Sequence, residues 1–165
     1  MLVVRALSSE RAQASGHTLS VEIRELLSGQ ADQLVALFAA VLPESDTARA
    51  ERLEGADAFL RDPGSFVLGA YFDATPVGLV WGLQMRSPSG WLRTYVHELD
   101  VHSDWRRRGV GSALITESMA LARRRGSSKL WLSTGADNRI AQALYDSLGG
   151  SREPFGDVNY SWTLD

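Results

Sequence analysis

Three arginines followed by two closely spaced glycines form the most distinctive chemical pattern in the sequence. Glycine lets a backbone approach a ligand closely, and the first N–H groups of a helix point at an anion under a favourable dipole. Arginine adds forked donors for phosphate oxygens. The pattern therefore predicts a pyrophosphate site, although taken alone it also fits a solvated surface turn that caps a helix. Its residues are Arg106, Arg107, Arg108, Gly109, Val110 and Gly111.

Two carboxylates, Glu98 and Asp100, precede the arginines on an apolar strand. Residues two apart in a strand share a face, so the pair is expected on one side of the sheet, with His97 and Leu99 on the other. Such a pair can bind a cation and accept its proton. The plainer alternatives are an ion pair between Glu98 and Arg93, and a core position with one hydrogen bond for His97.

Hydrophobic periodicity indicates the elements that carry these residues. Strands are expected over residues 18–25, 66–72, 77–83, 91–101, 129–133, 151–155 and 158–164. Helices are expected after a cap at Ser28 or Gly29 up to Pro43, over 47–60, from the glycines to Gly126, and over 138–148. Residues 1–17 show little pattern and are treated as an N-terminal extension. Residues 18–165 are expected to form a single domain.

Composition narrows the chemistry. The chain has 165 residues, 44% of them hydrophobic, which is enough for one core, and it contains no cysteine, so thiol chemistry is excluded. A net charge of −3 argues against a general nucleic-acid binder. No apolar run is long enough to span a membrane, so a cytoplasmic location is expected. His17, His97 and His102 have no metal-ligand spacing, and no metal site is expected.

The order of the motifs resembles the GNAT superfamily of N-acetyltransferases. The resemblance is carried by the strand 95–101, the segment 106–111, a long helix, the strand 129–133 and the motif Asn138-x-x-Ala-x-x-Leu-Tyr145-x-x-x-Gly149. It implies an α+β GNAT fold, in which a mixed, mostly antiparallel sheet of about seven strands is splayed between strands four and five and flanked by about four helices. It also implies acetyl-CoA as co-substrate.

The resemblance implies a role for each matching residue. The segment 106–111 would hold the pyrophosphate of acetyl-CoA, and the backbone of the preceding strand would lie along its pantetheine arm. Asn138 would hold the same arm. Glu98 would be the base that takes a proton from the attacking amine, with Asp100 as the alternative. Tyr145 would be the acid that protonates the thiolate, or else only a core aromatic. Leu99 and Val101 would lie beside the cofactor.

Within the superfamily, the chain resembles the aminoglycoside 3-N-acetyltransferases. The similarity is carried by the segments 66–73, 76–80, 95–109 and 143–149. It implies a polycationic sugar as acceptor, received by acidic side chains. Asp100 stands where that family tends to have a small residue, and the segment 155–159 is longer here. The candidate substrate-facing acids are Glu98, Asp100, Glu153 and Asp157.

Two other functions remain open from sequence. One is transfer to another small amine or to a protein amine, and the other is a catalytically silent domain that binds acetyl-CoA. The resemblance also implies a homodimer interface at the expected last strand, near Trp162; the alternative is that this residue packs within one chain. Turnover on any amine separates the catalytic hypotheses from the silent one.

Overall fold

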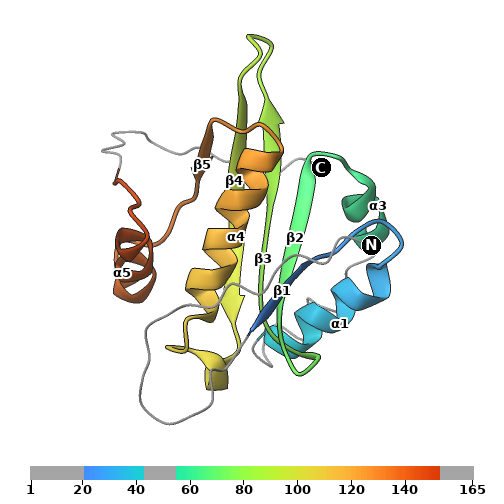
Figure 1. Ribbon diagram of the computed structural model, residues 1–165, viewed down its shortest axis with the longest axis vertical. Helices are drawn as coiled ribbons and strands as arrows, with labels where there is room; N and C mark the ends of the chain where they lie inside the picture. Colours follow the sequence, from blue (N-terminus) through green and yellow to red (C-terminus); the bar gives the residue numbers. More distant parts are fainter. Residues whose placement is uncertain (1–20, 43–54, 153–165) are drawn as a thin grey trace, which may run out of the picture. The chain divides into compact units, whose positions relative to one another are not determined.

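Five strands form one mixed sheet in the part of the chain that the structure describes, residues 21–42 and 55–152 of a computed structural model (Figure 1). The strands lie side by side in chain order, the first four antiparallel and the fifth parallel to the fourth. They are β1 (Glu22–Glu25), β2 (Ser65–Phe72), β3 (Thr75–Arg86), β4 (Leu92–Val101) and β5 (Lys129–Trp131).

The expected number of about seven strands is therefore wrong for the described residues. The two further strands were expected over 151–155 and 158–164. Residues 151 and 152 are not in a strand, and the remainder of both segments lies outside the described residues. Glu153, Asp157 and Trp162 also lie outside them, as do the extension 1–17 and most of the expected helix 47–60.

Four α-helices are present among the described residues: α1 (Ala31–Val41), α3 (Ala56–Arg61), α4 (Val110–Arg124) and α5 (Arg139–Ser147), with one 3₁₀ turn, η2 (Ser103–Trp105). The cap of α1 is Gln30, not Ser28 or Gly29. Gly29 instead has a φ of +85°, and the Gln30 side chain accepts a hydrogen bond from the Leu27 N–H. The left-handed backbone of Gly29 changes the direction of the chain, so the helix cap is Gln30, one residue later than Gly29.

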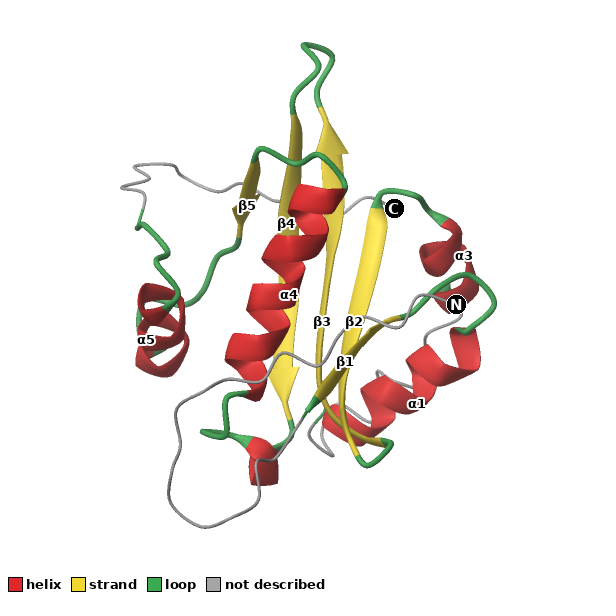
Figure 2. Cartoon of the chain, in the orientation of Figure 1, coloured by secondary structure: helices red, strands yellow, loops and turns green. Residues whose placement is uncertain are grey.

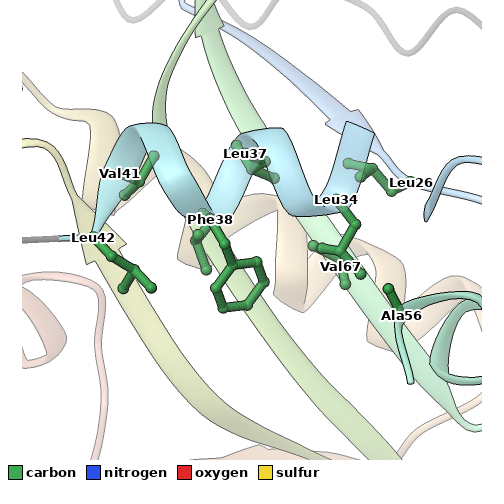
Figure 3. Close-up of a cluster of buried hydrophobic side chains, with 9 residues drawn as sticks. Leu26, Leu34, Leu37, Phe38, Val41, Leu42, Ala56 and Val67 are labelled. Atoms are coloured by element: carbon green, nitrogen blue, oxygen red, sulfur yellow. The ribbon is translucent and has the colours of Figure 1, made fainter. Parts of the chain in front are cut away.

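Helix α1 covers one face of the sheet through the apolar stripe that its sequence predicts. Leu37 is fully buried, and Figure 3 shows it in a cluster with Phe38 of α1, Ala56 of α3 and Val67 of β2. A Cβ added to Gly69 would lie 3.0 Å from the Leu37 side chain. This contact defines the face of the sheet that we call the α1 face.

Helix α4 covers the opposite face (Figure 2). Gly78 of β3 pairs with Val101, and a Cβ on Gly78 would lie 2.9 Å from Val110 and 3.2 Å from Leu114. Since Gly69 pairs with Leu79, the neighbour of Gly78, the two glycines point to opposite faces. Because Gly78 has no side chain, the first turn of α4 packs closely against β3, beside the end of β4.

The far end of α4 is fixed by polar contacts to the sheet. The Arg125 guanidinium pairs with Glu25 at 2.5 Å and donates to the Ser65 carbonyl at 2.8 Å. The Thr94 and Ser127 hydroxyls are 2.8 Å apart. Because Arg125 and its partner are three-quarters buried, this contact is worth more than an exposed ion pair. The helix therefore has a fixed position relative to β4.

The chain divides into two compact units, residues 1–133 and 134–165, so α5 is described by itself. Asn138 caps the helix, and Gln142 ties the preceding loop by donating to the carbonyls of Gly135 and Ala136. At its far end, a hydrogen bond from Arg152 lowers the pKa of the exposed Asp146. No helix within the described ranges is long and apolar enough to cross a membrane.

Candidate active site

A β-bulge in β4 shapes the site. Trp81 of β3 pairs with Glu98, but the next residue, Gly82, pairs with Val96, so His97 is an extra residue without an opposite partner on β3. Such a bulge shifts the alternation of side chains by one position. Glu98 then shares the α1 face with its partner Trp81, since directly paired residues lie on the same face.

Gly82 permits the bulge. A Cβ at this position would collide with the backbone carbonyl of Tyr95 and lie 2.8 Å from the Phe66 ring. Glycine inside a strand commonly marks a bulge or a close backbone approach. Gly82, the second of the two glycines in the segment 77–83, is therefore a sequence signal for the bulge, one that hydrophobic periodicity alone does not reveal.

Glu98 accepts a hydrogen bond from a tryptophan. The Trp81 Nε1–H donates to Glu98 Oε2 at 2.8 Å, between partly buried groups. Arg93, the partner that the sequence offered as an alternative, has its guanidinium over the Trp91 ring, 4.5 Å from the ring centroid. Trp81 is a candidate site residue that the sequence does not reveal, because a tryptophan in an apolar strand is more often a packing residue.

The expected position of His97 is wrong. Its ring stacks on Trp81, with centroids 4.3 Å apart, and meets the edge of Tyr95 at 5.9 Å. It therefore lies on the same side of the sheet as Glu98, and it is exposed, not in the core. The bulge explains the error, because the extra residue breaks the two-residue repeat on which the expectation rested.

Five aromatic rings continue across the α1 face from α3 to β5. Phe59 meets Trp81 edge to face at 5.4 Å, and Tyr95 stacks on Trp131 at 4.3 Å. His97 joins these two pairs. Glu98 accepts a hydrogen bond from the second ring of this row, Trp81, and aromatic rings can contact the apolar part or the positive charge of an amine.

The remaining residues of β4 keep the expected alternation beyond the bulge. Asp100 pairs with Leu79 on the α1 face, as expected for a partner of Glu98, and is partly buried. Leu99 and Val101 pair with Val80 and Gly78 on the α4 face. The two carboxylates therefore share a face, as the sequence predicts.

Strand β4 continues beyond its pairing with β5 on the edge opposite β3. Strand β5 pairs with β4 only at residues 93–95, whereas β4 continues to Val101. Among residues 21–42 and 55–152, no strand pairs with residues 96–101 on that edge. The expected splay between strands four and five, and the placement of Leu99 and Val101 beside the cofactor, stay predictions. The Val101 carbonyl accepts from Arg106 Nε at 3.1 Å.

The segment 106–111 has the geometry of an anion site. Arg107 and Gly109 both have left-handed backbone, with φ of +62° and +83°. The first internal helix bond runs from the Ala113 N–H to the Gly109 carbonyl, so the N–H groups of Val110 and Gly111 have no partner within the helix. Left-handed residues next to a helix start turn successive N–H groups into one concavity.

The arginines are exposed at this helix start, and two of them are held. Arg106 is bound to the Val101 carbonyl, and the Arg108 guanidinium lies 5.1 Å from the centroid of Trp105. A Cβ on Gly109 would meet no atom within 4 Å, so the space above the turn is open. Exposed cations, open space and oriented N–H groups fit a pyrophosphate, and hence the CoA part of acetyl-CoA.

Helix α5 and its cap carry the last two expected site residues, Asn138 and Tyr145. The Asn138 side-chain oxygen accepts from the Ala141 N–H at 3.1 Å, so it caps α5. Its amide nitrogen can still donate to a ligand. Tyr145 is half-buried on the side of the helix that also carries Ala141 and Leu148. The expected roles of Asn138 and Tyr145 toward acetyl-CoA stay predictions.

The five-stranded sheet, the bulge in β4 and the glycine-containing turn before α4 are typical of acyl-CoA transferases. The chain belongs to the acetyltransferase (GNAT) family, since the model of that family matches residues 31–149. N-acetyltransferase 8 of Homo sapiens is 33% identical over 93 residues, which cover 56% of this chain and 41% of that protein. A ribosomal-protein-alanine N-acetyltransferase of Escherichia coli is 43% identical over 49 residues, 30% of this chain and 33% of that protein.

Solved structures share the fold at lower identity. An aminoglycoside acetyltransferase from an uncultured soil metagenomic sample superposes with a TM-score of 0.74 at 23% identity, covering 87% of this chain and 99% of that one. The aminoglycoside N-acetyltransferase AAC(6')-Iy in complex with CoA gives a TM-score of 0.69 at 17% identity, covering 93% and 100%. The chain spans less than half the length of the curated relatives named above.

Proposed function

We propose that the protein transfers the acetyl group of acetyl-CoA directly to a primary amine in a ternary complex. The observation that carries the proposal is the placement of Glu98 and Asp100 on one face of β4, on the strand that leads into the phosphate-binding turn. A cationic acceptor is attracted to this pair of carboxylates. Acetyl-CoA supplies an acyl group activated as a thioester.

Each proposed site residue has one role in the reaction. Glu98 takes a proton from the acceptor ammonium, because only the neutral amine is a nucleophile. The amine nitrogen then forms its bond to the acyl carbon, and the bond from that carbon to sulfur breaks. Tyr145 donates its phenolic proton to the departing thiolate, and the second proton that the nitrogen loses on becoming an amide passes through solvent to restore the phenol. The N–H groups at the start of α4 and the arginines hold the pyrophosphate.

The acceptor that we propose first is an aminoglycoside, acetylated at its 3-N position. The support is the resemblance of β2, β3 and β4 to aminoglycoside 3-N-acetyltransferases, together with the acidic pair. The fold is also shared with acetyltransferases of other specificity, including a ribosomal-protein-alanine N-acetyltransferase from Brucella melitensis at 24% identity and a TM-score of 0.66. A protein N-terminal amine is therefore the second candidate acceptor.

The test is CoA release from acetyl-CoA in the presence of aminoglycosides, polyamines, amino acids, and peptides with a free N-terminal alanine or a lysine. Turnover limited to aminoglycosides, with product mapping to the 3-amine, supports the full proposal. Turnover on the alanine peptide alone supports the second acceptor. Acetyl-CoA binding with no turnover on any amine contradicts the enzymatic proposal and supports the silent domain.

A further inference from the structure

We propose that Trp81 is a positioning residue that holds the Glu98 carboxylate for proton transfer. The inference rests on the proposed function, which makes Glu98 the base. Its starting observation is the hydrogen bond from Trp81 Nε1–H to Glu98 Oε2, at 2.8 Å. The bulge at His97 makes this bond possible, because it brings Trp81 and Glu98 into direct register on one face of the sheet.

The indole ring is held from two sides. The Phe59 ring of α3 meets it at 89° with centroids 5.4 Å apart, and the His97 ring lies against it at 4.3 Å. Trp81 is also packed against the buried cluster under α1. A ring fixed in this way keeps its N–H pointing in one direction, so the carboxylate that accepts from it is oriented as well.

The chemistry of the donor defines what Trp81 can do. An indole N–H can only donate, so Trp81 gains and loses no proton. The Glu98 carboxylate takes one proton from the acceptor ammonium, which leaves a neutral amine and a neutral carboxylic acid. The contribution of Trp81 is to fix the orientation of that carboxylate, because its N–H donates to Oε2.

A double-mutant cycle tests this role. Trp81→Phe keeps an aromatic ring between Phe59 and His97 but removes the donor. We expect it to lower kcat about tenfold, the effect of a lost hydrogen bond to a charged group, and to leave KM for acetyl-CoA within about twofold. The same substitution in a Glu98→Gln background is expected to cause almost no further loss, because both changes act through one carboxylate.

Trp91→Phe is the matched control, since Trp91 is exposed on the β3–β4 hairpin and contacts Arg93. It is expected to keep wild-type kinetics. Equal losses from Trp81→Phe in both backgrounds would overturn the inference, because a packing role does not depend on Glu98. If Glu98→Gln alone retains full activity, the assignment of the base fails first, and the proposed function must be revised before the role of Trp81.

A spectroscopic readout does not depend on activity or on a known acceptor. The chain has five tryptophans and hence five indole N–H resonances. The one absent from Trp81→Phe is expected to shift in Glu98→Gln, while those of the other tryptophans stay in place. If Trp81→Phe does not fold, Trp81→Tyr supplies the assignment of the resonance. The chemical shift in Glu98→Gln then still tests whether Trp81 donates to Glu98. An unshifted Trp81 resonance would overturn the inference.

Discussion

His97 and Glu98 are consecutive in the chain, yet both contact the same indole ring, that of Trp81. In a regular strand, consecutive side chains point to opposite faces. The bulge that breaks this rule lies beside Gly82, where a Cβ would collide with the Tyr95 carbonyl. The arrangement of His97 and Glu98 on the α1 face therefore depends on Gly82, a residue that has no side chain.

Replacing Gly82 with alanine is expected to destabilise the protein by about 2 kcal/mol or more, because the new methyl group meets backbone and the buried Phe66 ring. Thermal unfolding followed by circular dichroism measures the loss. Gly55→Ala is the control, since a Cβ at Gly55 meets nothing within 4 Å and its φ is −90°. Equal stability of the two variants would contradict the close approach at Gly82.

The sequence predicts the order and type of the described elements because their signals are local. Apolar runs on either side of a turn predict β2 and β3, and the stripe of Leu34, Leu37 and Phe38 predicts α1. Prediction fails where strand pairing determines the result. The face on which His97 lies depends on the register between β3 and β4, which the sequence does not show. Trp81 was missed for a related reason, since an indole that packs and an indole that donates look alike in a sequence.

Replacing Glu98 with alanine is expected to lower kcat/KM for the acceptor by about a hundredfold or more, the usual contribution of a general base. CoA release at saturating acetyl-CoA measures it. Asp100→Asn is the comparison within the pair, and its main expected effect is a higher KM for a cationic acceptor with a smaller change in kcat. A larger fall in kcat for Asp100→Asn than for Glu98→Ala would exchange the two roles.

Replacing Tyr145 with phenylalanine is expected to lower kcat by about a hundredfold if its hydroxyl protonates the thiolate, with little change in KM for acetyl-CoA. Tyr71→Phe is the control phenol, because Tyr71 lies on β2 and its hydroxyl belongs to the packing around Gly69. Equal losses in kcat and in acetyl-CoA affinity for Tyr145→Phe would indicate that the ring packs and does not supply a proton.

The proposed role of the turn before α4 in phosphate binding can be tested with the two glycines that flank this helix, because both have a left-handed backbone. Gly109 precedes the helix with a φ of +83°, and Gly126 follows it with a φ of +84°; a Cβ on either meets nothing within 4 Å. Alanine at each position is therefore expected to cost a similar free energy of unfolding, about 1 kcal/mol, from the left-handed backbone alone. Only Gly109→Ala is expected to raise KM for acetyl-CoA, by about tenfold, because relief of the strain tilts the N–H groups away from the pyrophosphate.

Thermal unfolding and acetyl-CoA titration of both variants measure the two effects. A similar rise in KM for Gly126→Ala would mean that helix stability, and not the turn, sets the affinity.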